Sequence, residues 1–197
     1  MILIRFKENI SNLKALMIRD KGDHILETLS NKQVKELLIK CWMTHDGMWF
    51  LHCLRKTGIE KTNKINKAAS RGLGLIEAKR FKRILSIDEV KTLDNLKKFI
   101  DNVFKVVKAE FMKFSYKFLK NNIFQFEMHQ CFAYEGIKRI GVIDQYECGI
   151  YDRIEGWFEG LGIKFKASPQ IDGCLVHQGR KCVRNYTFIF PQISIEH

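Results

Sequence analysis

The fold of this chain is decided by the stretch Asn121-Asn122-Ile123-Phe124-Gln125-Phe126-Glu127-Met128-His129. Before it, apolar residues recur every three or four positions, which is typical of helices. From Phe124 onward they alternate with polar residues, as in a strand that is buried on one face. The pair Asn121-Asn122 favours a turn at the boundary. The stretch therefore separates a helical first part from a second part that contains a sheet.

A long helix is predicted in the first part, because a start signal and a stop signal frame it. Ser30 followed by Gln33 matches a capping box, in which each side chain bonds to the backbone N–H of the other residue. Thr57-Gly58 marks the end, since glycine is common just past a helix. One helix is expected over residues 31–56.

Two more helices are predicted before Asn121. The first covers residues 59–85 and has the apolar positions Ile65, Ala68, Ala69, Leu73, Ile76 and Phe81. The second opens near Asp88, where an acidic residue suits the positive end of the helix dipole. Its apolar positions continue at helical spacing to Phe114, which predicts a helix of more than about 25 residues.

The second part mixes short helices with strands. Residues 135–141 and 150–161 have helical spacing, whereas residues 163–167 and 185–190 alternate like strands. Residues 169–184 form a turn-rich connection between those strands. This order indicates an α+β fold, in which long N-terminal helices pack on a small C-terminal antiparallel sheet with a helical insertion.

Length and composition fit one domain of this kind. The chain has 197 residues, of which 46% are hydrophobic, and this is enough for a core. Residues 30–192 are expected to form the domain, with a helical layer over 30–120 and a sheet-containing part over 121–192, and residues 1–29 an added arm. No apolar run has the length of a signal peptide core or a membrane span, so a cytoplasmic location and no membrane partner are expected.

The positive charge is concentrated in one segment. The formal net charge is +12, and residues 55–120 alone hold 18 Lys and Arg against 7 Asp and Glu. Lys61, Lys64, Lys67 and Arg71 recur at helical steps and so form a basic stripe. Such a stripe suits either a solvated outer face or a nucleic acid partner, whose phosphates it would neutralise.

Candidate chemistry begins with two aromatic-flanked histidines of the first helix. His45, Trp49 and His52 share one face, and the surrounding apolar pattern predicts that this face points inward. An inward histidine beside a tryptophan suits a general base, a metal ligand or a pocket wall, and also an ordinary core histidine. Glu77, an acidic residue in a basic helix, is either a buried polar partner of His45 or part of a surface ion pair.

A second constellation consists of the C-terminal cysteines Cys131, Cys148, Cys174 and Cys182. In a reducing compartment they are free thiols or ligands rather than disulfides. Cysteine is a usual zinc ligand, and zinc or iron are the metals considered, although no Cys-x-x-Cys pair is present. Plain buried thiols, or a nucleophile at Cys131 or Cys174 activated by a nearby histidine, are the other hypotheses.

Three groups of residues carry a resemblance. They are Trp42-Met-Thr-His45-Asp46-Gly-Met-Trp49-Phe50, then Gly74-Leu-Ile-Glu77-Ala-Lys-Arg80, and then the four spaced cysteines. In this order they resemble an uncharacterised family of small bacterial and archaeal cytosolic proteins, over residues 30–192. More loosely, the end of the chain is similar to 4-vinyl-reductase-type ligand-binding domains and to the L-2-amino-thiazoline-4-carboxylate hydrolase-like family. The looser resemblances imply a small-molecule pocket between helices and an antiparallel sheet.

Three functional hypotheses follow. The leading one is a cytosolic domain that binds a small molecule or a metal between its first helix and the sheet, with His45, Trp49 and Glu77 at the pocket and the four cysteines at any metal or thiol site. The alternative is a hydrolase of a C–N bond in a small cyclic or amide substrate, with His45 as catalytic base and a cysteine or a metal-bound water as nucleophile. The third is nucleic acid binding through the basic helical face.

Overall fold

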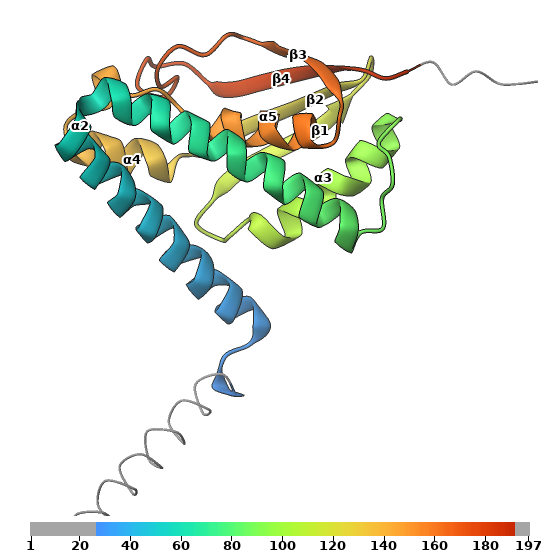
Figure 1. Cartoon of the computed structure of the whole chain (residues 1–197), viewed down its shortest axis with the longest axis horizontal. Helices are drawn as coiled ribbons and strands as arrows, with labels where there is room; N and C mark the ends of the chain where they lie inside the picture. The colour runs from blue at the N-terminus through green and yellow to red at the C-terminus, as the bar shows by residue number, and fades with distance from the viewer. Residues whose placement is uncertain (1–26, 192–197) are drawn as a thin grey trace, which may run out of the picture. The chain divides into compact units, whose positions relative to one another are not determined.

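The computed structural model describes residues 27–191 (Figure 1). Its elements are α2 (Asn31–Ile84), α3 (Leu93–Val107), β1 (Lys113–Leu119), β2 (Ile123–Gln130), α4 (Phe132–Arg139), the 3-10 helix η1 (Ile143–Gln145), α5 (Ile150–Gly160), β3 (Lys164–Ser168) and β4 (Cys182–Ile189). The strands form one antiparallel sheet in the order β1-β2-β4-β3. The α+β class is therefore confirmed, while most of the arm expected over residues 1–29 lies outside the described residues.

The chain divides into two units, with the boundary between Met43 and Thr44. In the first unit, the described residues hold the start of α2. Ser30 N donates to Gln33 Oε1 at 2.8 Å, and Gln33 N donates to Ser30 Oγ at 3.3 Å. This reciprocal pair confirms the predicted capping box.

Within the second unit, α2 is interrupted at Gly58. The φ angle of Gly58 is 74°, in the left-handed region that favours glycine. The predicted stop after residue 56 and the new helix from residue 59 are thus confirmed. The six predicted apolar positions of that helix do not mark its buried face, because Ile65, Ala68, Ala69 and Ile76 are exposed. Its buried residues are Thr62, Asn63, Gly74, Glu77 and Ala78.

The prediction for the third helix was wrong in length. The helix α3 has 15 residues and begins after Thr92, whose side chain accepts a hydrogen bond from Asn95 N. The strand β1 begins at Lys113, inside the range expected to be helical up to Phe114, and no strand was expected before Asn121. The helical and the strand pattern overlap at this point. Phe111 and Phe114 are three residues apart, as on one face of a helix, while Phe114 also begins the alternation of a strand.

The turn between β1 and β2 is the one expected at Asn121-Asn122. Both residues have positive φ angles, 62° and 55°, which asparagine tolerates better than most residues. Tyr116 pairs with Phe126, and Phe126 in turn with Arg184 of β4. The decisive stretch therefore forms an inner strand of the sheet.

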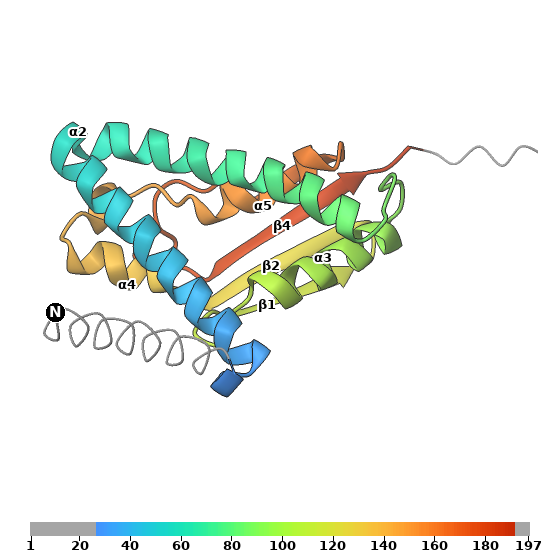
Figure 2. The same cartoon turned by 60° about the horizontal axis from the view of Figure 1, so that its bottom comes forward.

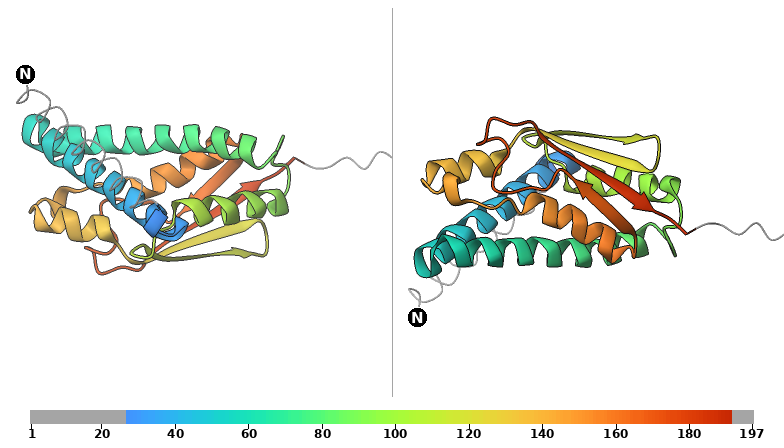
Figure 3. Two further views of the ribbon diagram at one scale, coloured as in Figure 1. Left: turned by 90° about the horizontal axis from the view of Figure 1, so that it is seen from below. Right: turned by 90° about the horizontal axis from the view of Figure 1, so that it is seen from above.

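One face of the sheet carries the core. The ring of Phe104 in α3 lies 4.7 Å from that of Tyr116 and 6.1 Å from that of Phe126. The ring of Phe158 in α5 lies 5.0 Å from that of Tyr186. Figures 2 and 3 show α3 and α5 side by side on this face, with the part of α2 that follows Gly58 running along α5.

Helices α2 and α5 approach closely at glycines. A Cβ atom at Gly74 would lie 2.2 Å from the carbonyl oxygen of Arg153, and one at Gly156 would lie 2.4 Å from that of Arg71. In both cases the clashing atom belongs to the backbone, so no side chain can move aside to make room for the methyl group. These glycines allow the polar face of α2 to reach α5.

This contact predicts opposite effects at two glycines of α2. We expect Gly74→Ala to lower the free energy of unfolding by about 2 kcal/mol, because the methyl group forces the helices apart. The matched control is Gly72→Ala, where nothing lies within 4 Å of the new Cβ. There the gain in helix propensity should raise stability by up to about 1 kcal/mol. Urea denaturation of both variants measures the two effects, and equal changes would contradict the close contact.

Candidate functional site

The four C-terminal cysteines come from four different segments, and we refer to them as the four-cysteine group: Cys131, Cys148, Cys174 and Cys182. Cys131 caps the N-terminus of α4, where its Sγ accepts a hydrogen bond from Tyr134 N at 3.4 Å. Cys148 lies just before α5, Cys174 in the connection between β3 and β4, and Cys182 at the start of β4. All are free thiols, as are Cys41 and Cys53 of α2.

The fold gathers these thiols in one place. Burial raises the pKa of Cys148 to about 12, and the thiolate charges of Cys131, Cys182 and Cys174 add to the increase. Burial raises the pKa of Cys131 to about 11, with further contributions from Cys182 and Cys174. The pKa of Cys182 is raised by burial and by the charge of Cys174. These mutual charge effects indicate that the four thiols lie in the same region of the fold.

The thiols are gathered without being in ligand geometry. In the part of the chain that the structure describes, no three His, Cys, Asp or Glu side chains are arranged to hold a metal ion. Cysteine side chains reach a new position by rotation about χ1 alone, between staggered rotamers. Binding of an ion by the four-cysteine group therefore requires its side chains to turn toward one another.

The segment that carries Cys148 is held by α2. The buried side chain of Asn63 donates from Nδ2 to the carbonyl oxygen of Gln145 at 2.7 Å and accepts from Glu147 N at 3.2 Å. Lys67 Nζ lies 2.9 Å from Glu147 Oε2. The backbone just before Cys148 is thus fixed on both sides of Tyr146, whose ring contacts that of Phe50 at 5.8 Å.

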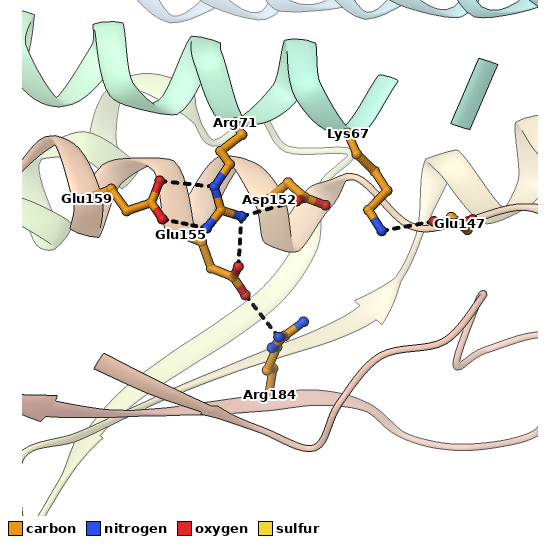
Figure 4. Close-up of polar contacts among 7 residues, drawn as sticks. All are labelled: Lys67, Arg71, Glu147, Asp152, Glu155, Glu159 and Arg184. Carbon is orange, nitrogen blue, oxygen red and sulfur yellow. Dashed lines mark hydrogen bonds and ion pairs between the residues drawn. The ribbon is translucent and has the colours of Figure 1, made fainter. Parts of the chain in front are cut away.

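Next to this segment, an ion-pair network joins α2, α5 and β4 (Figure 4). Arg71 Nε donates to Glu159 Oε2 at 2.9 Å, and Arg71 Nη1 contacts Asp152 at 3.3 Å and Glu155 at 3.1 Å. Glu155 also pairs with Arg184 of β4 at 3.0 Å. The hydrogen bond to Glu159 is the largest cause of a raised Arg71 pKa. Two members of the predicted basic stripe, Lys67 and Arg71, are therefore neutralised by acidic residues of the same chain.

Glu77 belongs to a second buried ion pair and does not contact His45. Arg153 Nε donates to Glu77 Oε2 at 2.8 Å, and Arg153 Nη2 donates to Oε1 at 2.6 Å. Trp157 Nε1 donates to Glu77 Oε2 at 2.8 Å. The side chain of Glu77 is only 10% exposed. Of the two expectations for Glu77, the partnership with His45 was wrong, and the ion pair exists but is buried.

The expected inward face of His45 and Trp49 was also wrong. The side chain of His45 is 68% exposed, and Trp49 is 63% exposed. Their rings are 6.5 Å apart, and His45 Nδ1 lies 3.8 Å from Asp46 Oδ1. No residue of 44–57 is buried, and within the second unit the first buried residue of α2 is Thr62. The structure therefore does not bring His45, Trp49 and Glu77 into one pocket, and their binding role stays a prediction.

Three residues that shape this region were not singled out as site residues from the sequence. They are Asn63, Arg184 and Tyr151, whose hydroxyl lies 3.2 Å from Cys182 Sγ. Burial is the largest cause of the raised Tyr151 pKa, followed by the hydrogen bond with Cys182. A usable signal existed for Arg184, because it stands between Cys182 and Tyr186 at alternate positions of a strand and so had to share their face.

Residues 27–157 match a family of unknown function, DUF6125. No curated protein matches the chain. The matched range includes Cys131 and Cys148 and ends before Cys174 and Cys182. Within residues 27–191, no helix combines the length and the apolar character that crossing a membrane requires.

Proposed function

Since the chain belongs to the DUF6125 family, whose function is unknown, we propose from its own residues that it is a metal-binding domain. The four-cysteine group binds one zinc ion, or one iron ion, through four thiolates. The proposal is supported by the effect that the charges of these cysteines, which come from four separate segments, have on one another's pKa values. Thiolates in a tetrahedral set of four are the preferred ligands of these two metals.

The positions of the cysteines support a role for the metal in stability. Four protein ligands complete a tetrahedral shell and leave no open position for water, as in structural zinc sites. The group joins the start of α4, the start of α5, the connection after β3 and the start of β4. A bound ion would tie these four segments into one unit. A closed shell also disfavours the alternative in which a metal-bound water acts as the nucleophile of a hydrolase.

The other hypotheses receive less support from the described contacts. A hydrolase with His45 as base requires a nucleophile near it, and the contacts of His45 are with Trp49 and Asp46. Binding of nucleic acid through the basic stripe is weakened by the ion pairs of Lys67 and Arg71. Binding of a small molecule remains compatible with a metal that organises the sheet end of the domain.

The thiol pKa values predict that metal binding releases protons. Cys131, Cys148 and Cys182 have raised pKa values and are protonated at neutral pH, so an ion must displace a proton from each. We expect a stoichiometry of about one Zn²⁺ per chain and the release of at least three protons at pH 7. The apparent affinity should rise with pH, by about tenfold per pH unit for each proton released.

Isothermal titration of the reduced protein with Zn²⁺, in buffers with different ionisation enthalpies, measures both quantities. Titration with Co²⁺ adds a thiolate-to-metal charge-transfer band that shows which atoms bind. Saturation at one equivalent with proton release and this band supports the proposal. Affinity that does not change with pH, or the absence of the band, would overturn it.

A further inference from the structure

The face of the sheet that points away from the core brings a serine, a histidine and a glutamate together. Ser115 of β1 is exposed and pairs with Glu127 of β2. Ser115 Oγ lies 2.8 Å from His129 Nε2, and His129 Nδ1 lies 3.9 Å from Glu127 Oε1. We refer to these three residues as the serine cluster. Its side chains stand in the order hydroxyl, imidazole, carboxylate.

A β-bulge places the imidazole of the serine cluster. Met128 of β2 pairs with Phe114 of β1, and the next pair joins Gln130 to Lys113. His129 is therefore an extra residue without a partner on β1. His129 and Gln130 are both exposed, so the regular alternation along β2 ends here. Bulges of this kind re-aim a side chain and are common beside active sites, and this one accounts for the reach of the imidazole to a hydroxyl.

The carboxylate determines which nitrogen of His129 can act as a base. Glu127 lies beside Nδ1, and a negative charge there favours the tautomer that carries its proton on Nδ1. Nε2 then has a free electron pair and accepts a hydrogen bond from the O–H of Ser115. This is the arrangement in which a histidine activates a serine while a third group orients the histidine. Such contacts are often long without substrate and shorten when it binds.

The serine cluster differs from two other histidine–carboxylate pairs of the described residues. His45 Nδ1 lies 3.8 Å from Asp46 Oδ1, and His177 Nε2 lies 2.8 Å from Asp144 Oδ1. In the part of the chain that the structure describes, neither of these imidazoles forms a hydrogen bond with a hydroxyl, so neither pair has a nucleophile to activate. The side chain of His129 is 48% exposed, and reagents can therefore reach the serine cluster from solvent.

We propose that Ser115 is an activated nucleophile that accepts an acyl group from small ester or thioester donors, with His129 as its general base and Glu127 as the positioning residue of that base. Ser115 Oγ attacks the carbonyl carbon while its proton passes to His129 Nε2. The bond to the leaving oxygen or sulfur then breaks, and the imidazolium gives its proton to the leaving group. The products are an ester of Ser115 and a free alcohol or thiol. Exposed lysines two positions before and after Ser115 in β1, Lys113 and Lys117, add positive charge that favours the developing oxyanion.

The test measures the reactivity of each serine in the full chain. Two probes are used, a fluorophosphonate, which bonds to an activated serine and releases fluoride, and p-nitrophenyl acetate, which transfers its acetyl group and releases p-nitrophenol. Peptide mass spectrometry identifies the modified residue and gives the rate of its modification. The variants are His129→Ala and Glu127→Gln. The matched control is His177→Ala, because the side chain of His177 is also partly exposed, at 37%, and lies beside a carboxylate.

We expect both probes to modify Ser115 faster than any other serine of the chain. His129→Ala should slow this reaction by about 100-fold and Glu127→Gln by about 10-fold, since the first removes the base and the second only its orienting charge. His177→Ala should leave the rate unchanged. Circular dichroism of each variant shows whether it is folded, and the exposed positions of these side chains favour that. Absence of modification at Ser115, or an equal rate in His129→Ala and in the unmodified protein, would overturn the proposal.

Discussion

Replacing Cys148 with serine is expected to weaken Zn²⁺ binding by at least about a hundredfold, which is the largest effect that we predict. Structural zinc sites contribute about 10–16 kcal/mol from four ligands, so each thiolate accounts for about 3 kcal/mol. The charges of the other three members of the group all act on the pKa of Cys148, so we choose this ligand for removal. Competition with a chelator at pH 7 measures the change.

The matched control for this variant is Cys41→Ser. Cys41 is an exposed free thiol of α2, outside the four-cysteine group. It should leave the affinity and the stoichiometry unchanged. If Cys148→Ser and Cys41→Ser bind Zn²⁺ equally well, the ion does not use the group, and any binding observed is adventitious.

Glu77→Gln is expected to produce the largest loss of stability away from the cysteines. Glutamine keeps the shape of the side chain but removes its charge, which takes the charged partner Glu77 away from the guanidinium of the half-buried Arg153. The two side chains are 10% and 19% exposed, so solvent screens the pair only weakly. Breaking a pair of this kind costs about 3 kcal/mol or more of unfolding free energy. Thermal and urea unfolding should both show this loss.

Glu60→Gln is the matched control for Glu77→Gln. It makes the same substitution on the same helix, at an ion pair with Lys64 in which Glu60 is 81% exposed. An exposed pair of this spacing adds almost nothing to stability, so no measurable change is expected. Equal effects of the two substitutions would show that the Glu77 pair is not buried in solution.

Much of the secondary structure was predictable because its signals are local. The capping box at Ser30, the stop at Gly58 and the alternation from Phe124 to Met128 each involve residues a few positions apart. The strand β1 was missed for the same reason. Its aromatic residues Phe114, Tyr116 and Phe118 alternate with polar residues as in a strand, but Phe114 also continues the helical spacing from Phe111, and the pairing with β2 decides between the two periods.

The buried face of the second helix depends on a partner that the sequence does not reveal. Apolar spacing assigns the core side to residues such as Ile65 and Ile76, both about half exposed in the structure. In the structure the face that carries Gly74 and Glu77 is buried instead. There α5 supplies Arg153 as the ion-pair partner of Glu77, and its Gly156 packs against Gly74. Ion pairs between residues about 80 positions apart leave no local pattern.

The candidate site was predictable as a set of residue types and not as an arrangement. Cys131, Cys148, Cys174 and Cys182 were selected as ligands, but without a close cysteine pair their spacing gives no sign that they meet. Their proximity results from sheet register, which places Cys182 beside Met128, just before Cys131, and from the hold of Asn63 on the segment before Cys148. For His45 and Trp49 the sequence motif is dense, but the structure places it on residues 44–57 of α2, none of which is buried.

The most direct test of the metal site is the metal content of the full chain, purified under reducing conditions without chelators and analysed by inductively coupled plasma mass spectrometry. We expect about one equivalent of zinc or iron per chain, lost in Cys148→Ser and retained in Cys41→Ser. A content below roughly a tenth of an equivalent of either metal, in protein that is folded and has its thiols reduced, would contradict a metal-binding role for the four-cysteine group.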